Sequence, residues 1–217
     1  MTDFIDLAYR YFPYILRGAV VTLELTALAL IGSVLIGLVV TLARMSPTRW
    51  LRGPAVVYIE LIRATPALLQ LFVVYFGLTA FDIRLDPFSA ASLTLAVIGG
   101  AYAAEVFRAG IEAVDRGQYE AARSLGMPAA LAMRRIILPQ AAVLILPPFT
   151  NFVIAMVKDT SLALTIAVPE IMYRSYDAAS QSFRSIEIYA MAGAIYVAIC
   201  LPLSQLAQVL ERRRAPR

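Results

Sequence analysis

The chain has 217 residues and a formal net charge of +4, and 60% of its residues are hydrophobic while only 16% are charged. A soluble domain is about half apolar and about a quarter charged, so this composition indicates a polytopic membrane protein, with a single transmembrane domain over residues 1–217 and no separate soluble domain. Because there is no histidine and one cysteine, Cys200, the sequence excludes histidine acid–base chemistry, histidine or multi-cysteine metal sites and an intrachain disulfide.

In chain order, five segments are apolar enough to cross a hydrocarbon core of about 30 Å, which takes about 20 helical residues. They run over residues 18–43, 55–80, 88–107, 137–157 and 186–210. Residues 5–14 mix aromatic and polar side chains, which predicts a helix lying at the outer membrane surface. Thr65-Pro66 should break or kink the second segment. Residues 161–168 are too few to span, which favours a re-entrant or broken helix.

Basic residues are spread unevenly over the connections, and this bias predicts the orientation. The larger set of twelve comprises Arg44, Arg49, Arg52, Arg108, Arg116, Arg123, Arg134, Arg135, Arg212, Arg213, Arg214 and Arg217. The opposite side has six: Arg10, Arg17, Arg84, Lys158, Arg174 and Arg184. We therefore expect the N-terminus outside and the C-terminus in the cytoplasm. The net charge is then an orientation signal rather than a sign of nucleic-acid binding.

The connection between the third and fourth segments is polar and contains helix start and stop signals. Asp115 can cap a helix while Gln118, three residues later, reaches back to the cap. The helix over residues 118–125 should end at Gly126, which adopts the left-handed conformation without penalty. Two prolines then mark the start of a new helix and the turn into the fourth segment: Pro128 and Pro139. A solvated surface helix is the plain interpretation of this pattern, and a docking surface for a partner is the alternative.

The spacing in this connection resembles the EAA loop of ABC importer permeases, in which an ATP-hydrolysing subunit grips the membrane subunit. The matching residues are Glu120, Ala121, Ala122, Gly126, Ile136, Leu138 and Pro139. Further stretches are similar to motifs of the polar amino acid permeases: YIELIRATP at 58–66, AYAAEVFRAGI at 101–111, KDTSL at 158–162 and PE at 169–170. The resemblance covers residues 15–210, and the chain is identified as a member of that subfamily.

The resemblance implies an all-α type I ABC importer permease with five transmembrane helices and a cytoplasmic coupling loop over residues 115–139. The residues implied in coupling to the ATPase are Glu120, Ala121, Ala122, Leu125 and Gly126. The implied partners are ATP-binding subunits, a second permease subunit, identical or homologous, and an extracytoplasmic binding protein, in a bacterial inner membrane. The chain has no phosphate-cradling Gly-x-x-x-x-Gly-Lys-Ser/Thr motif. We therefore expect no cofactor on this chain, with ATP and Mg²⁺ used by the partner subunits.

Ionisable and polar groups inside apolar segments are functional candidates because a bilayer makes them costly. Two pairs at helical spacing are interpreted as structural or gating ion pairs: Glu60 with Arg63, and Glu105 with Arg108. For Glu60 and Arg63, long side chains reaching from a helix end to the membrane surface are the alternative. The substrate-path candidates are Asn151, Asp159, Thr160 and Ser161, next to the short run that cannot span. An ordinary outer helix end is the alternative interpretation of Lys158 and Asp159.

One position departs from the subfamily pattern. Many of these permeases read Asn-Glu-Phe where this chain has Asn151-Phe152-Val153. An acidic group there could attract a cationic amino acid, and Phe152 cannot. The resulting hypothesis is that the cargo is a neutral or acidic amino acid rather than arginine or lysine.

Two other classes of protein compete with the importer. A self-contained secondary transporter or channel would be expected to carry its own coupling-ion site and often an internal repeat, and neither is evident in the sequence. A membrane-embedded enzyme is disfavoured because no plausible set of nucleophile and base is present.

Overall fold

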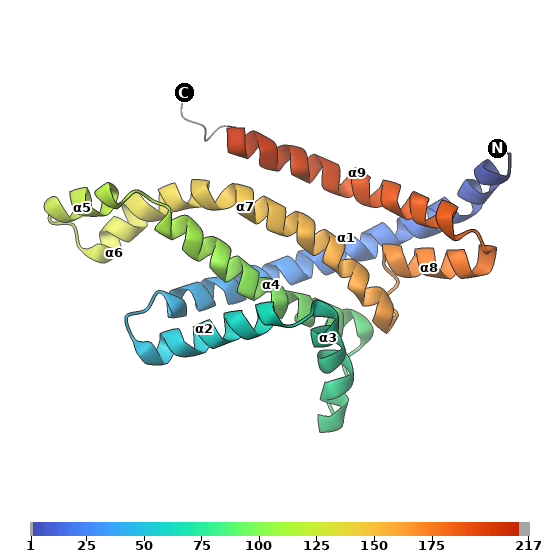
Figure 1. The fold of residues 1–217 in the computed structure, drawn as a ribbon, viewed down its shortest axis with the longest axis horizontal. Helices are drawn as coiled ribbons and strands as arrows, with labels where there is room; N and C mark the ends of the chain where they lie inside the picture. Colours follow the sequence, from blue (N-terminus) through green and yellow to red (C-terminus); the bar gives the residue numbers. More distant parts are fainter. Residues whose placement is uncertain (1, 213–217) are drawn as a thin grey trace.

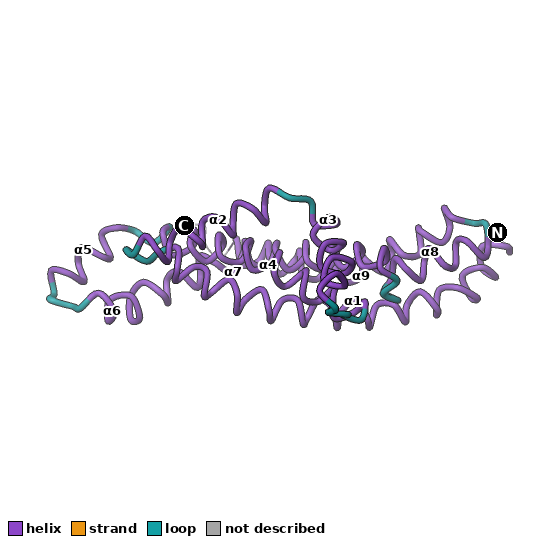
Figure 2. The backbone as a smooth tube through the Cα atoms, turned by 90° about the horizontal axis from the view of Figure 1, so that it is seen from below, coloured by secondary structure: helices purple, strands orange, loops and turns teal. Residues whose placement is uncertain are grey.

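The computed structural model describes the backbone of residues 2–212 and the side chains of residues 4–209. Within these residues the chain is helical throughout, with short connections (Figure 2). The elements are α1 (Thr2–Arg44), α2 (Arg49–Ala64), α3 (Ala67–Phe72), η1 (Val73–Gly77), η2 (Leu78–Phe81), α4 (Pro87–Glu112), α5 (Arg116–Ser124), α6 (Ala129–Ala132), η3 (Met133–Ile137), α7 (Leu138–Asp159), η4 (Thr160–Ile166), α8 (Ile171–Ser182) and α9 (Ser185–Arg212).

The helices form an elongated bundle in which α5 and α6 lie at one end and α8 lies with the N-terminus at the other (Figure 1). Four helical stretches of the described chain are long and apolar enough to cross a membrane: Phe4–Arg44, Pro87–Glu112, Ala129–Ile166 and Ser185–Val209. The pair Arg49–Ala64 and Ala67–Phe81 passes the same test as one broken span. The expected five segments therefore correspond to four continuous helices and one broken helix.

The contact between α1 and α4 holds the centre of the bundle together. A Cβ atom on Gly99 of α4 would lie 2.1 Å from the Ser33 Oγ of α1, so only glycine fits there. The Thr41 hydroxyl on α1 donates to the Gly37 carbonyl at 2.7 Å and to the Ala104 carbonyl of α4 at 3.2 Å. Small residues and hydroxyl groups at helix contacts allow this close backbone approach without a large apolar side chain.

The second segment is broken at Thr65-Pro66, as the sequence predicts, because proline cannot continue a helical hydrogen-bond ladder. The two helices on either side are bent by 106°, so residues 55–80 are not one straight span. Polar side chains satisfy the carbonyl groups that the break leaves free. The Thr65 hydroxyl donates to the Leu61 carbonyl at 2.9 Å, and the Gln70 amide donates to the Ile62 carbonyl at 2.9 Å.

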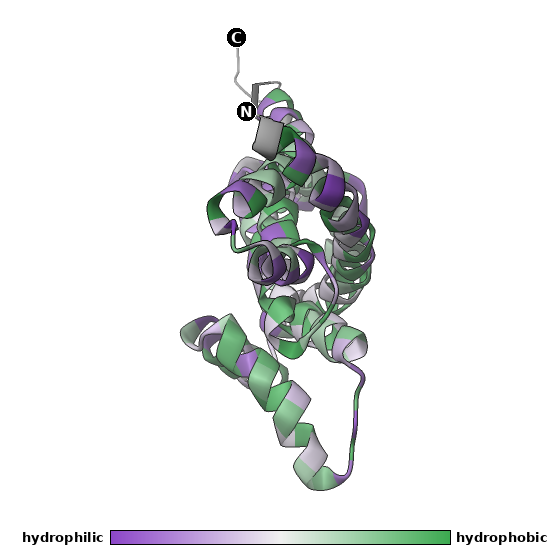
Figure 3. Ribbon diagram, turned by 90° about the vertical axis from the view of Figure 1, so that its right-hand side faces the viewer, coloured by the Kyte–Doolittle hydropathy of each residue, from purple (hydrophilic) through white to green (hydrophobic). Residues whose placement is uncertain are grey.

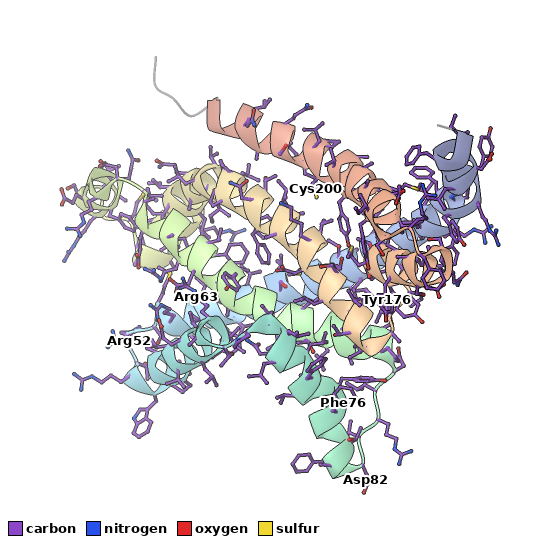
Figure 4. The ribbon with its side chains drawn as sticks, turned by 45° about the vertical axis from the view of Figure 1, so that its right-hand side comes forward. Arg52, Arg63, Phe76, Asp82, Tyr176 and Cys200 are labelled. Carbon is purple, nitrogen blue, oxygen red and sulfur yellow. The ribbon has the colours of Figure 1, made fainter. Side chains whose placement is uncertain are left out.

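Beyond this break, α3, η1 and η2 form an arm over residues 67–81 that projects from the bundle (Figures 1 and 3). Its ribbon is mostly hydrophobic in Figure 3, and Phe76 lies on it in Figure 4. The large hydrophobic side chains that it exposes are Leu69, Val73, Phe76 and Phe81. The arm therefore presents more apolar surface than one copy of the chain covers.

Residues 5–14, expected to form a helix at the outer membrane surface, are helical and form the first turns of α1. α1 continues without interruption from Thr2 to Arg44, with Pro13 inside it. Its first turns pack against α8 and α9, where Ile15 and Ile188 are fully buried. The Tyr14 hydroxyl also donates to the Asp177 carboxylate of α8 at 2.7 Å. Of the aromatic residues in this stretch, Tyr11 and Tyr14 pack against α8 and α9, while Tyr9 is 84% exposed.

The turn expected at Leu138-Pro139 is also absent. Helix α6, the π-helical turn η3 and α7 follow one another directly, and Pro139 lies at the first turn of α7. The wider π turn ends at Ile137, two residues before the proline, and such turns are a common way to accommodate an irregularity within a helix. The short run after α7 does break as expected: η4 is a 3₁₀ turn that ends at Ala167, whose φ is 63°.

The tightness of the α1–α4 contact predicts a large difference between two glycine substitutions. Gly99→Ala should destabilise the chain by about 1–3 kcal/mol, the usual range for overpacking. Gly193→Ala on α9 is the matched control, because nothing lies within 4 Å of its added Cβ atom, and it should be neutral or slightly stabilising. Thermal unfolding of the purified chain in detergent measures both. Equal unfolding midpoints for the two variants would contradict the packing argument.

Candidate functional site

The connection that carries the coupling motif forms a short helix with a defined stop. Gly126 follows α5 with a φ of 70°, a conformation that L side chains rarely adopt. The Met127 amide donates to the Ala122 carbonyl at 3.1 Å, and the Gly126 amide donates to the Arg123 carbonyl at 3.0 Å. These are the two hydrogen bonds of a Schellman motif. The expected helix stop at Gly126 is confirmed.

The start of α5 differs in part from the expectation. The Asp115 carboxylate accepts a hydrogen bond from the Gly117 amide at 2.7 Å, which confirms the cap. The expectation that Gln118 reaches back to the cap is wrong. Its side-chain oxygen accepts instead from the Gln140 amide at 3.2 Å. Gln118 therefore ties α5 to the first turn of α7 rather than closing a capping box.

The exposed surface of α5 is made by some of the expected coupling residues but not by all of them. Glu120 and Ala121 are exposed, and the Leu125 side chain is 78% exposed. Ala122 is only 1% exposed because it packs against its own chain. Ala122, although it is among the implied coupling residues, therefore anchors the helix rather than adding to its exposed surface.

Tyr119 holds α5 against the end of α4. Its hydroxyl donates to the Ile111 carbonyl at 3.5 Å. Partial burial of this hydroxyl raises its pKa because the ionised form would lose hydration. With the Gln118–Gln140 hydrogen bond, this contact connects α5 to both of its neighbouring long helices.

The Glu105 carboxylate on α4 contacts arginines from three helices. The Oε2 atom of Glu105 lies 2.8 Å from the Arg108 guanidinium and 4.0 Å from that of Arg63, and its Oε1 atom lies 3.2 Å from that of Arg44. The expected Glu105–Arg108 pair is confirmed, and Arg44 of α1 is an additional partner. This arginine cluster (Arg44, Arg63, Glu105 and Arg108) joins α1, α2 and α4 at one point.

The expected ion pair between Glu60 and Arg63 is wrong. Arg63 points toward Glu105 of α4 and lies 5.8 Å from the centre of the Tyr102 ring, while Glu60 forms no ion pair among the described side chains. Helical spacing identifies which residues could meet. It does not show that a residue on another helix offers the better partner.

A cavity of about 390 Å³ lies between α4, α7 and the start of α3. Asp159 of α7 is the only carboxylate among the described residues of its wall, and Tyr102 and Phe152 are its aromatic members. Phe152 also contacts the Phe149 ring, with ring centres 5.7 Å apart. The cavity therefore offers one anionic group beside aromatic and apolar surface.

The other substrate-path candidates do not share this cavity. Asn151 is exposed on α7 and lies outside the cavity wall. Thr160 is fully buried, and its hydroxyl donates to the Val157 carbonyl at 2.7 Å. Ser161 is partly buried and likewise absent from the wall. Of the four residues, only Asp159 meets the space where a small molecule could lie.

A second carboxylate, Glu170, organises the end of the bundle near the N-terminus. Glu170 lies between the fourth and fifth candidate spans and is fully buried. Its carboxylate accepts hydrogen bonds from the backbone amides of Met172 at 2.9 Å and Tyr173 at 2.7 Å. The Tyr196 hydroxyl of α9 donates to it at 3.1 Å. Burial raises its pKa to about 7, although the three hydrogen bonds oppose the rise. Glu170 thus caps α8 and connects α8 to α9.

The sequence interpretation missed α8 and gave Glu170 no role. An acidic residue directly after Pro169 and before a polar run is a helix-start signal, and it could have identified α8. No signal in the sequence could have identified Arg44 as a partner of Glu105. The two residues are 61 positions apart, and no local pattern relates them.

Comparison with known proteins gives a consistent result. A family profile described as "Binding-protein-dependent transport system inner membrane component" matches residues 11–216. The L-cystine transport system permease protein TcyB of Bacillus subtilis (strain 168) is 40% identical over 210 residues, which is 96% of this chain and 90% of TcyB. The glutamine transport system permease protein GlnP of Escherichia coli (strain K12) is 38% identical over 203 residues, 93% of each chain.

A solved structure described as "Crystal structure of an amino acid ABC transporter with histidines" contains a similar chain. It is 41% identical and superposes with a TM-score of 0.92, covering 98% of this chain and 99% of that one. The similarity therefore extends over almost the whole fold.

The raised pKa of Glu170 predicts a pH dependence of stability. The unfolded chain loses this proton near pH 4.5 and the folded chain near pH 7, so the stabilisation present below pH 4.5 is lost as the pH rises through 7. The loss is at most about 3 kcal/mol. We expect the unfolding midpoint of the purified chain to fall between pH 5 and pH 8. Glu170→Gln should remove that decline, and an unchanged decline in this variant would exclude Glu170 as its source.

Proposed function

The chain belongs to the family of binding-protein-dependent transport system inner membrane components, and we propose from this premise how its residues take part in transport. It is the membrane-spanning subunit of an ATP-driven ABC importer for amino acids. It is not itself an enzyme, because ATP hydrolysis belongs to separate subunits. A self-contained secondary transporter is not favoured, since the relatives are permease subunits of such importers.

The proposed setting is a bacterial inner membrane with the N-terminus outside. The arginine bias supports this orientation, as does the position of α5 at the opposite end of the bundle from the N-terminus (Figure 1). Arg212, Arg213, Arg214 and Arg217, which contribute to that bias, lie outside the described side chains. In this orientation α5 faces the cytoplasm, where ATP and Mg²⁺ are used by the partner subunits.

We assign the docking surface for an ATP-binding subunit to the exposed side of α5 and its stop. The observation that carries this proposal is the Leu125 side chain, 78% exposed beside the rigid Schellman turn. Glu120 adds a charge and Ala121 a small surface on the same helix, while Ala122 and Gly126 fix its position and its end. A well-anchored short helix with an apolar tip can transmit movement because its contacts with α4 and α7 leave it little freedom.

The arginine cluster is assigned as an inner gate or brace. It fastens α1 and α2 to α4 through Arg44 in the last turn of α1 and Arg63 in the last turn of α2. Because its partners come from separate helices, a change in helix tilt would have to break or exchange these ion pairs. Glu60 has no part in this arrangement.

The cavity beside Asp159 is assigned as the point where the cargo crosses this subunit. Every amino acid carries an ammonium group, and Asp159 could pair with it. The cargo side chain would then meet Tyr102 and Phe152. Neither is charged, so a cationic cargo would find no anionic partner at position 152. This supports a neutral or acidic cargo. Asn151 and Ser161 remain candidates only for another conformation of the transporter, and Thr160 is a structural residue.

A second permease subunit is the proposed partner of the arm over residues 67–81. The arm leaves its own bundle and exposes Phe76 and Phe81, and such apolar surface marks a contact with another protein or with lipid. An extracytoplasmic binding protein would deliver the amino acid at the end where α8 lies. Whether the second subunit is identical or homologous does not affect this arrangement.

The docking assignment predicts that Leu125→Ala weakens the assembled importer. Loss of a central apolar contact at an interface costs about 2 kcal/mol, so affinity for the ATP-binding subunit should fall about thirtyfold. Ile186→Ala is the matched control, since this side chain is 84% exposed at the opposite end of the bundle. Titration of the purified permease with the ATP-binding subunit measures the effect. Equal values for both variants would refute the docking assignment.

The cargo assignment predicts that Asp159→Asn raises the apparent KM of uptake about tenfold or more, because a hydrogen bond to a charged group contributes about 1.5–3 kcal/mol. Glu24→Gln, which changes an exposed carboxylate on α1, should leave uptake unchanged. Phe152→Glu should improve transport of arginine. These effects are measured by uptake of an amino acid panel into vesicles containing the assembled importer. A strong preference of the unmodified importer for arginine over glutamine and glutamate would overturn the assignment.

A further inference from the structure

A groove of about 290 Å³ runs between α7 and α9, on a different side of α7 from the cavity that Asp159 lines. Its apolar walls are Ile154 of α7 and Val197 and Leu201 of α9. Cys200 borders it from the face of α9 that is turned toward α7 (Figure 4). This groove belongs to none of the sites assigned above.

The groove has a charged end and a mostly apolar length. α7 and α9 run in opposite directions (Figure 1), so Lys158 in the last turn of α7 lies near Tyr196, and Ser204 lies two turns further along α9 at the other end. With the N-terminus outside, the charged end is the outer one. The apolar walls then lead from Lys158 toward the middle of the membrane.

Lys158 has no ion-pair partner in the described part of the chain, where five ion pairs are formed by other residues. The two nearby carboxylates are directed elsewhere. Asp159 lines the cavity toward α4, and Glu170 accepts hydrogen bonds from the start of α8 and from Tyr196. A cation beside apolar walls in a membrane protein is costly unless an anion neutralises it.

We propose that this groove binds one membrane phospholipid with an anionic headgroup. The phosphate pairs with Lys158, and one acyl chain follows Val197 and Leu201 along the groove. An additional helix, which is about 10–12 Å across, would not enter so small a space. A transported amino acid would leave the apolar length of the groove unfilled. A lipid supplies both the anion and the chain.

Cys200 provides a direct reporter because it is the only cysteine of the chain. Lipid in the groove should shield its thiol from N-ethylmaleimide. The experiment measures the alkylation rate of the delipidated full-length chain in detergent, by intact mass, with and without phosphatidylglycerol. We expect phosphatidylglycerol to slow alkylation more in the unmodified chain than in Lys158→Gln. The difference between the two should be about fivefold, because that is the contribution of one lysine to binding at an anionic membrane surface.

Two further variants control for folding and for charge. Lys158→Arg should retain the protection, because it keeps the cation. Arg17→Gln, which removes an exposed charge from α1, should behave as the unmodified chain. Both should elute as the unmodified chain does in size-exclusion chromatography. Phosphatidylcholine, whose headgroup has no net charge, should protect Cys200 less than phosphatidylglycerol does.

Several results would overturn the proposal. Equal protection of Cys200 in the unmodified chain and in Lys158→Gln would show that the cation does not hold the ligand. Equal protection of Cys200 by glycerol phosphate, which has no acyl chain, would show that the apolar walls do not contribute to binding. Protection by the cargo amino acid would assign the groove to the transport path. A thiol that does not react even without lipid would show that the groove is closed in solution.

Discussion

The close approach of α1 and α4 is the constraint on which the other sites depend. Gly99 meets Ser33 with no room for a Cβ atom, and the Thr41 hydroxyl reaches across to a carbonyl of α4. In a membrane, helix association gains little from the hydrophobic effect, so van der Waals contact and such hydrogen bonds must hold helices together. This contact places Arg44 of α1 within reach of Glu105, and it sets one wall against which α7 packs.

α4 is the element that connects the proposed docking surface with the proposed cargo cavity. Its last turn accepts a hydrogen bond from Tyr119 of α5, Glu105 lies about two turns before that end, and Tyr102 faces the cavity that also contains Asp159. The three features lie on one continuous helix. A displacement of α5 therefore has a short physical route to the cavity, through a rigid helix rather than through loops.

Local sequence patterns predicted those features that depend on a few neighbouring residues. The Asp115 cap, the stop at Gly126 and the break at Pro66 each follow from the chemistry of one residue and its immediate neighbours. The positions of the apolar helices follow from hydropathy and length. These determinants lie within the segment that they shape, which is why they can be read without the fold.

Contacts between distant segments were not predictable in this way. Gln118 has a suitable local partner at the cap but bonds to Gln140, and Arg63 has one in Glu60 but turns to Glu105. In both cases tertiary packing offers a better geometry than the local alternative. The candidate site was therefore predicted at the level of its motifs, while its ion-pair partners and the composition of its cavity required the folded chain.

The unbroken length of α1 has a mechanical consequence. The helix runs from the contact of Tyr14 with α8, past Ser33, to Arg44 beside Glu105. At 1.5 Å per residue, Tyr14 is about 28 Å and Arg44 about 16 Å from Ser33. If α1 tilts about its tight contact with Gly99, that contact acts as a fulcrum. The two ends then swing in opposite directions, and the end at Tyr14 travels nearly twice as far as the end at Arg44.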